Sequence, residues 1–265
     1  MQWEHLTAPE LAEAARETDT CILAMGVIEK HGEHLPLGTD FLVVHHIACL
    51  AAEREPAVVF PPWYFGQVYN LRCFPGTVTI RPSLMLDLIL HIFDEIGRNG
   101  FGKIIVFNGH GGNVSLTRFL ARCTMWEEKP YTVYLPNERL TGERKAQHDA
   151  ICETDLHDHA CECETSISLA IHEDLVKMNA VPEEPGTPQG KLEHLGDIYT
   201  GTTWTSNHPT HYAGDARPAT VEKGKKLLEL HVAALAEHIA AVKADEVAPA
   251  LQKEFFRRAE GPLDD

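Results

Sequence analysis

Short apolar runs alternate with longer amphipathic stretches along the chain. Runs with the length of buried strands occur at 21–27, 57–60, 103–107 and 131–135. Apolar residues at helical spacing predict helices at 3–17, 40–53, 83–97, 114–126 and 218–242, with another beginning near residue 164. Strands that alternate with helices are typical of α/β proteins, and we expect that fold class here.

Capping residues predict where several of these helices begin. Thr7 precedes Pro9 and should cap the first helix. Asp40 is a favoured capping residue for the helix at 40–53, and this structural role competes with a role in metal binding. The helix at 83–97 should begin at Ser83 and bury a stripe of four apolar residues: Leu84, Leu88, Ile92 and Ile96.

Other stretches show no clear strand or helix pattern. Residues 181–216 are rich in Pro, Gly, Thr and His, which predicts a long irregular segment rather than a second domain. His208 and His211 in this segment invite an interpretation as metal ligands. Additional histidines in loops, however, are more often not ligands. The aromatic-rich connection at 63–73 could wall a substrate pocket or cover a subunit contact. Residues 137–156 are compatible with a helix, and 243–265 should form a charged, frayed, peripheral tail.

Composition and charge narrow the class of protein. A length of 265 residues fits a single domain spanning 1–265, and 44% hydrophobic content is sufficient for a large core. No apolar run approaches the roughly 20 residues of a membrane span, and the polar N-terminus is unlike a signal peptide, so we expect a cytoplasmic protein. The formal charge of −16 argues against nucleic acid or an anionic membrane as a partner. The seven cysteines lack zinc-ribbon spacing and should be reduced thiols.

The densest group of metal-ligand residue types follows the first predicted strand, in GVIEKHGEHLPLGTD at 26–40. In an extended segment alternate side chains share a face, so Glu29, His31 and Glu33 can point the same way. The neighbouring glycines allow turns that would bring Asp40 back toward them. Carboxylates and imidazoles together suit zinc, manganese or iron(II), although a solvated surface loop would show the same residues.

Two further groups of acids and histidines lie at the ends of predicted elements. NGHGGN at 108–113 follows a predicted strand and contains His110, while HDHACECETS at 157–166 precedes an apolar helix. The turn around His110 matches neither common phosphate-binding motif, which favours a metal ligand. One shared metal site explains all three groups together, whereas unrelated surface loops would require a coincidence.

These motifs resemble those of the creatininase (creatinine amidohydrolase) family. The resemblance covers about residues 20–230, and its motifs occur in the family's order: E-x-H-G-x-H-L-P-L-G-T-D at 29–40, FPGT at 74–77, NGHGGN at 108–113, H-A-x-x-x-E-T-S at 159–166 and GDARPATVEKGKKLL at 214–228. It implies a three-layer α/β/α sandwich with a mostly parallel sheet and two divalent metal ions, with zinc favoured over manganese or iron. It also implies hydrolysis of a C–N bond in a cyclic amide or related small molecule, usually by a homohexamer.

The chain departs from the family pattern at two places. Asn70 and Leu71 stand where members often have a Glu-His pair before FPGT, which leaves the substrate open. Gly111 and Gly112 replace the tyrosine and the metal-binding glutamate that follow this histidine in creatininase itself. The family pattern supplies Glu164 as the candidate for the missing carboxylate.

The resemblance also implies a set of metal ligands. One metal would be held by Glu29, Asp40 and His110. The other would be held by His31, Asp40 and Glu164, so that Asp40 would bridge the two ions. If Asp40 also caps its helix, one carboxylate oxygen would serve each role.

The expected reaction is attack of a hydroxide between the two metals on a carbonyl carbon. His159 would deliver a proton to the departing nitrogen, and the motif alignment favours it over His157 as the working base. The alternatives are a formamide, peptide or lactone substrate at the same metals, or a non-catalytic scaffold of the same fold. The presence of every expected ligand argues against a scaffold.

Overall fold

The computed structural model describes residues 1–137 and 140–261, and it contains both helices and strands. The helices are α1 (Ala8–Thr18), α2 (Thr39–Arg54), α3 (Pro82–Arg98), α4 (Val114–Cys123), α5 (Gly142–Ile151), α6 (Glu162–His172), α7 (Thr203–Asn207), α8 (Val221–Ala244) and α9 (Val247–Glu260). The strands are β1 (Thr20–Met25), β2 (Val58–Val59), β3 (Lys103–Asn108), β4 (Thr132–Tyr134), β5 (His157–His159) and β6 (Ala213–Gly214).

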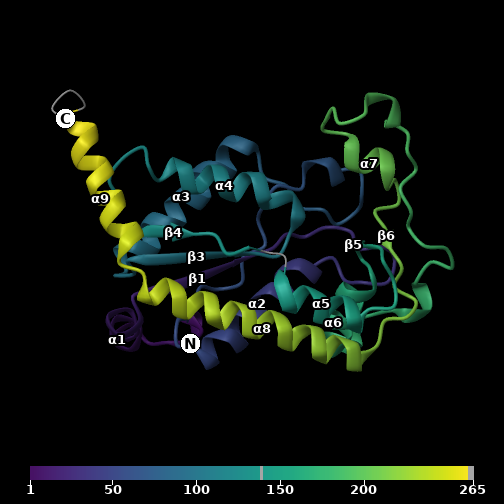
Figure 1. Ribbon diagram of the computed structural model, residues 1–265, viewed down its shortest axis with the longest axis horizontal. Coiled ribbons are helices and arrows are strands. Elements are labelled where there is room, and N and C mark those ends of the chain that lie inside the picture. Colours follow the sequence, from purple (N-terminus) through teal and green to yellow (C-terminus); the bar gives the residue numbers. More distant parts are fainter. Residues whose placement is uncertain (138–139, 262–265) are drawn as a thin grey trace.

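The main sheet has four parallel strands in the order β2-β1-β3-β4 (Figure 1). β1 and β3 lie at its centre and pair over their whole length, from Thr20 opposite Lys103 to Met25 opposite Asn108. Every residue of both strands is buried, which explains why each appears in the sequence as a largely apolar run. β5 and β6 form a separate antiparallel pair away from this sheet (Figure 1).

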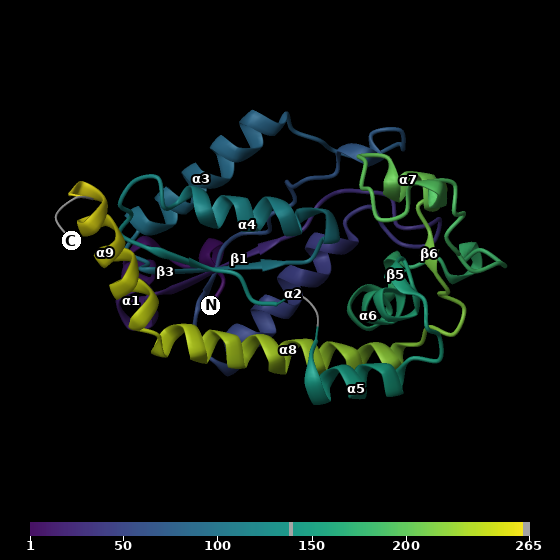
Figure 2. The ribbon, with the colours of Figure 1, turned by 45° about the horizontal axis from the view of Figure 1, so that its top comes forward.

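Helices cover both faces of the main sheet. Along β1 the side chains of Leu23 and Met25 pack in one core with α1, α3 and α4, whereas those of Ile22 and Ala24 pack in a second core with α2 and α8. Figure 2 shows α3 and α4 on one side of the strands and α2 and α8 on the other. The alternation of side chains along the strands builds two cores, and the three-layer α/β/α sandwich is confirmed.

The prediction for α3 is wrong at the start of the helix and at Leu84, whereas Ile96 is buried and Leu88 and Ile92 are partly buried against the same core. The helix begins at Pro82, and its cap residue is Arg81 rather than Ser83. Leu84 is 47% exposed, and the residues that face the core are Met85, Ile89, Phe93 and Ile96. The predicted stripe lies next to the observed one, and the helix has apolar residues on both. Helical spacing alone could therefore not distinguish the two faces.

Both ends of the chain differ in part from expectation. Residues 3–17 divide into a 3-10 turn at Trp3–His5 and α1, which Thr7 caps as predicted, in a capping box with Glu10. The prediction of a frayed tail is wrong, because α9 forms there and the side-chain amide of Gln252 donates to the carbonyl oxygen of Tyr131 at 2.9 Å. Residues 262–265 of that tail lie outside the described residues.

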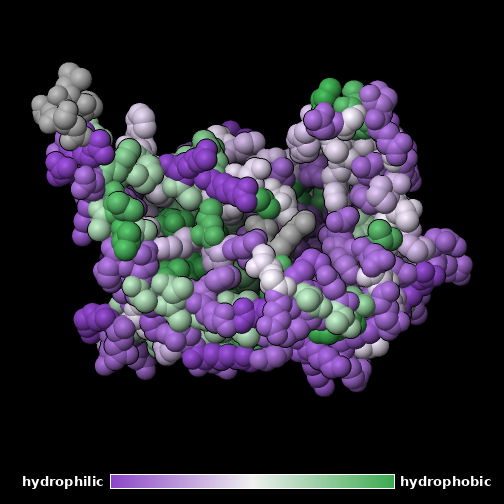
Figure 3. Space-filling view, viewed as in Figure 1, coloured by the Kyte–Doolittle hydropathy of each residue, from purple (hydrophilic) through white to green (hydrophobic). Residues whose placement is uncertain are grey.

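The segment at 181–216 is irregular over most of its length, as predicted, and carries α7, β6 and a 3-10 turn at Glu193–Leu195. It lies at the opposite end of the molecule from α9 (Figure 1). The polar stretch at 137–156 contains α5, although its residues 138–139 lie outside the described part. No helix among the described residues is long and apolar enough to cross a membrane. The face shown in Figure 3 is largely hydrophilic, in keeping with the net charge of −16.

A pair of substitutions in α3 tests which face packs on the sheet. Ile89→Ala should lower the free energy of unfolding by about 2–5 kcal/mol, because it leaves a cavity in the core. Leu84→Ala removes an exposed side chain from the same helix and should change that free energy by less than about 0.5 kcal/mol. Urea unfolding followed by circular dichroism measures both variants. If both substitutions lowered the free energy of unfolding equally, this would contradict the observed orientation of α3 on the sheet.

Candidate metal centre

The candidate residues gather where β1 and β3 end. These strands are paired through their last residues, Met25 and Asn108, so the loops that follow them leave the sheet side by side. The first loop carries Glu29 and His31 and leads into α2, and the second carries His110. The carboxyl end of a parallel sheet is the usual place for a binding site in α/β proteins.

Four side chains converge on the carboxylate of Asp40. His110 Nδ1 lies 3.1 Å from Glu29 Oε1 and 3.0 Å from Asp40 Oδ2. His31 Nε2 lies 2.9 Å from Asp40 Oδ1 and 3.9 Å from Glu164 Oε1. Two triads share Asp40, and the ligand atoms of each lie within 4.8 Å of one another: Glu29–Asp40–His110 and His31–Asp40–Glu164. The structure brings together the same two triads that the sequence led us to expect.

Most of these side chains are removed from solvent, and several lack hydrogen bonds. Glu29 and His31 are fully buried, and Asp40 is 4% exposed. Both oxygens of Glu29 and Oδ2 of Asp40 have no hydrogen-bond partner within the part of the chain that the structure describes. The close approaches of His110 to these oxygens therefore lack hydrogen-bond geometry. A buried carboxylate is costly unless a cation or a well-placed donor compensates its charge, so the residues present fit a cation site.

Backbone carbonyl groups hold one ring nitrogen of each of two histidines. The 2.9 Å contact between His31 Nε2 and Asp40 Oδ1 is also a hydrogen bond when Nε2 carries a proton. Nδ1 of His31 donates to the carbonyl oxygen of Glu29 at 3.2 Å, and Nε2 of His110 donates to that of Gln67 at 3.0 Å. In the neutral rings the other nitrogens, Nε2 of His31 and Nδ1 of His110, present lone pairs to carboxylate oxygens. Such an arrangement is repulsive unless a cation or a proton lies between the two atoms. Metal-binding histidines are usually held in this way, through a hydrogen bond from the second ring nitrogen.

The pKa values in the site reflect its excess of negative charge. Burial opposes protonation of His31, but the surrounding carboxylates, led by Asp40, outweigh burial and raise its pKa to about 10. Burial also opposes protonation of His110, but Glu29 and Asp40 outweigh it and raise that pKa well above its usual range. Desolvation raises the pKa of Glu164 to about 8. The site therefore favours added positive charge, which protons or divalent cations can supply.

Of the two histidines considered as a base, His159 lies beside the triads. Its Nε2 donates to the carbonyl oxygen of Lys30 at 2.9 Å, and its Nδ1 lies 3.9 Å from Glu29 Oε1. Burial and the neighbouring His31 hold the pKa of His159 well below its usual range, so its imidazole is neutral and Nδ1 carries a lone pair. His157 lies instead in a separate cluster with two cysteines.

The segment at 181–216 places His211 in the site, which the sequence did not predict. His211 is 2% exposed, and its Nε2 lies 3.5 Å from Glu29 Oε2. Trp204 donates its indole N–H to Nδ1 of His211 at 2.8 Å, so the neutral imidazole carries its proton on Nε2, toward Glu29. At 3.5 Å, Nε2 of His211 and Oε2 of Glu29 do not form a hydrogen bond, and Nε2 of His211 has no hydrogen-bond partner among the described residues. His208 packs on Trp204, outside the triads. Loop composition gave no signal for His211, because its contact depends on the path of the whole segment.

Two expectations about the first loop are wrong. Glu33 does not share a face with the candidate ligands, because it is exposed and pairs with Lys30 at 2.6 Å. Gly32 has a φ of +57°, which breaks the extended conformation on which that expectation rested. Asp40 does not cap α2, since Gly38 is the cap residue and Asp40 lies within the first turn. The carboxylate of Asp40 is consequently available to the triads.

The connection at 63–73 holds His110 in place. The carbonyl group of Gln67 accepts the ring N–H of His110, and the backbone N–H of Gln67 donates to Asn113 Oδ1 at 2.7 Å. Trp63, which was expected either to wall a substrate pocket or to cover a subunit contact, is buried in the core and donates its indole N–H to the carbonyl oxygen of Phe65. Neither alternative applies to Trp63.

Glu164 is positioned by the packing of α6 against α8. It is the third residue of α6, and its Oε2 accepts a hydrogen bond from the backbone N–H of Ala160. α8 approaches α6 closely at Gly224, where a Cβ would lie 1.8 Å from the carbonyl oxygen of Ser166. A larger residue at this position would push the two helices apart, and the carboxylate of Glu164 would move with α6.

Known proteins share both the sequence pattern and the fold. The family model for creatininase, described as creatinine amidohydrolase, matches residues 4–239. A 3-dehydro-scyllo-inosose hydrolase of Thermotoga maritima is 25% identical over 244 residues, which cover 86% of this chain and 78% of that protein. A creatinine amidohydrolase of Pseudomonas putida is 24% identical over 246 residues, which cover 86% of this chain and 92% of that protein.

Solved creatininase structures have the same fold. A crystal structure of creatinine amidohydrolase superposes with a TM-score of 0.78 at 22% identity, covering 92% of this chain and 98% of the other. A mutant creatininase of Zn-Zn type gives a TM-score of 0.77 at 22% identity, with coverage of 92% and 98%. The family model spans nearly the whole length of the chain. This chain belongs to the creatininase (creatinine amidohydrolase) family.

Proposed function

We propose that this protein is a metal-dependent hydrolase that cleaves an amide C–N bond in a small cyclic amide. The observation that carries the proposal is the buried pair of imidazoles, His31 and His110. One ring nitrogen of each is held by a backbone carbonyl group, and the other faces a buried carboxylate. Relatives described as hydrolases and amidohydrolases support it. Creatininase structures described with zinc or manganese support the use of metal.

Two divalent cations would be held by the two triads. Glu29, Asp40 and His110 would bind one, and His31, Asp40 and Glu164 the other, with Asp40 shared between them. Mixed imidazole and carboxylate donors suit zinc first and manganese second. When bound, such cations supply Lewis acidity, which polarises a carbonyl group and lowers the pKa of a water.

Side chains of this protein would transfer the proton and hold the carboxylate of Glu29 in position. His159 has an available lone pair on Nδ1 and a proton fixed on Nε2, so it can take up a proton and return it to a leaving nitrogen. His211 would be a positioning residue, since its Nε2–H faces the second oxygen of Glu29. The rings of Trp204 and Phe74 flank these histidines and add apolar surface beside them, which suits a compact ring substrate.

A substrate panel tests the proposed reaction. Protein loaded with zinc or manganese should hydrolyse a cyclic amide such as a lactam, a hydantoin or creatinine. Glu29→Gln should lower metal affinity by about tenfold or more and abolish turnover, whereas Glu33→Gln, in the same loop but exposed, should match the wild type. Turnover that persists after complete removal of metal would contradict the proposal. Cleavage of formamides, peptides or lactones alone would overturn the cyclic-amide substrate class.

The proposed role of His159 predicts that replacing it lowers kcat without lowering the metal content. His159→Gln should lower kcat on the best substrate of that panel by about 10²–10⁴-fold, because the proton acceptor is lost. Metal content should stay at the wild-type level if His159 acts on the proton alone. Its ligand atom lies within 4.8 Å of those of Glu29 and His31, so a loss of metal in this variant would instead show that His159 is a ligand. His157→Gln is the matched control and should leave kcat close to the wild type. If His157→Gln shows the larger loss, the assignment of the base is wrong.

The raised pKa values predict that metal binding releases protons. With a pKa of about 10, His31 is protonated at pH 7, and His110 is raised in the same direction, so both must lose a proton before they can bind metal. Manganese, which thiolates bind weakly, should therefore release more than one proton per chain at pH 7 and bind more tightly as the pH rises toward 9. Calorimetry in two buffers of different ionisation enthalpy measures the release. Binding without proton release would contradict the electrostatics of the site.

A further inference from the structure

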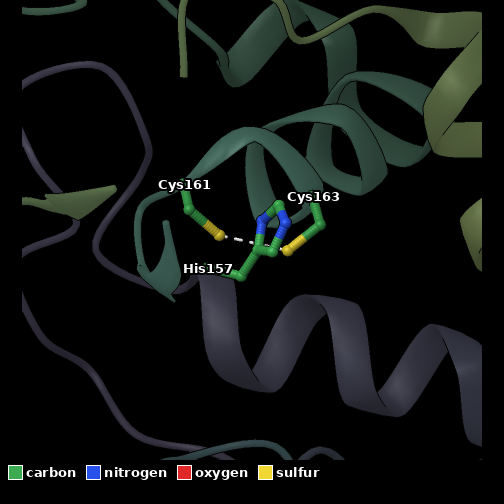
Figure 4. Close-up of side chains that lie close together, drawn as sticks. All are labelled: His157, Cys161 and Cys163. Carbon is green, nitrogen blue, oxygen red and sulfur yellow. Dashed lines mark hydrogen bonds between the residues drawn. The ribbon is translucent and has the colours of Figure 1, made fainter. Parts of the chain in front are cut away.

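A second group of metal-ligating side chains lies outside the two triads. His157 of β5, Cys161 at the cap of α6 and Cys163 in its first turn have their ligand atoms within 4.8 Å of one another. The two sulfur atoms are 3.1 Å apart, and both thiols are reduced (Figure 4). We propose that this His–Cys–Cys cluster binds one thiophilic metal ion of the zinc type, independently of the proposed hydrolytic site.

The ligand atoms of the cluster determine which metal ion it would bind. Two sulfur atoms and an imidazole are the ligands that zinc and other thiophilic cations prefer, whereas hard cations such as magnesium prefer oxygen. Cys161 is 2% exposed, and Nδ1 of His157 is buried with no hydrogen-bond partner among residues 1–137 and 140–261. A buried ring nitrogen beside two thiols is a site where a cation would satisfy polar groups that otherwise lack partners.

The carboxylates of the neighbouring Glu162 and Glu164 already interact with other groups. The carboxylate of Glu162 accepts hydrogen bonds from the backbone N–H groups of Glu153 and Thr154 and from Lys223. Glu164 directs one oxygen toward His31 and the other to a backbone N–H. The cluster therefore offers nitrogen and sulfur but no carboxylate, which separates its chemistry from that of the triads.

The geometry requires only a small adjustment. Zinc–sulfur bonds of about 2.3 Å at tetrahedral angles place two sulfur atoms about 3.8 Å apart, so the thiols must separate by less than about 1 Å. Cys163 is only partly buried and lines a cavity of about 230 Å³, which gives its side chain room to move. Asp40, His110 and Glu164 line the same cavity, so the two sites share a path of entry for ions. In the bound state both cysteines would be thiolates, and three protein ligands would leave a fourth position for a solvent molecule.

Cadmium titration of the full-length, reduced protein tests the proposal. Cadmium bound to thiolates gives a sulfur-to-metal charge-transfer band in the ultraviolet, whereas the oxygen and nitrogen ligands of the triads give none. We expect the band to saturate at one equivalent of cadmium per chain. Glu29→Gln should retain it, which keeps failure of this site distinguishable from failure of the hydrolytic one.

Cysteine variants complete the test. Cys163→Ser should remove most of the band and weaken cadmium binding by about tenfold or more, while Cys73→Ser, which alters an exposed cysteine, should leave both unchanged. Cys163→Ala provides a second variant at the same partly buried position, and circular dichroism confirms that each variant is folded. Absence of the band in reduced wild-type protein, or a band that is unchanged in both Cys163 variants, would overturn the proposal.

Discussion

The site is organised by the close approach of imidazole nitrogens to buried carboxylates. His31 and His110 cannot turn away from Asp40, because each is tied through its other ring nitrogen to a backbone carbonyl group. Glu29 cannot reach water, since it is fully buried. Close contact between these groups is stable only when positive charge lies among them. Protons can satisfy this constraint, and so can the two proposed cations, which would also supply the Lewis acidity for amide hydrolysis.

The fold delivers this arrangement through a few rigid contacts. The parallel pairing of β1 and β3 brings two loops to one edge of the sheet, although they are far apart in the sequence. The close approach of α8 to α6 at Gly224 sets the position of Glu164. The long irregular segment then reaches back from the same chain and places His211 against Glu29. Each contact comes from a different part of the chain, so the site forms only when the whole fold is in place.

Much of the fold was predictable, because strands buried on both faces appear as apolar runs, and the resemblance to the creatininase family indicated which residues after them are candidate ligands. The remainder depends on tertiary contacts. An apolar helix such as α3 does not reveal which side packs on the sheet, so Leu84 was misplaced. The direction of Glu33 was set by one positive φ at Gly32, which a sequence does not display. His211 reaches the site by the path of a loop that has no periodic pattern.

Anomalous diffraction from crystals grown with zinc would test the central claim most directly. Data collected on both sides of the zinc absorption edge locate the metal without reference to activity. We expect two peaks at the two triads that share Asp40. One should lie within Glu29–Asp40–His110 and the other within His31–Asp40–Glu164, with Asp40 contacting both. No peak at Asp40, with His31 and His110 found as protonated donors to the carboxylates, would show that protons rather than metals hold this site together.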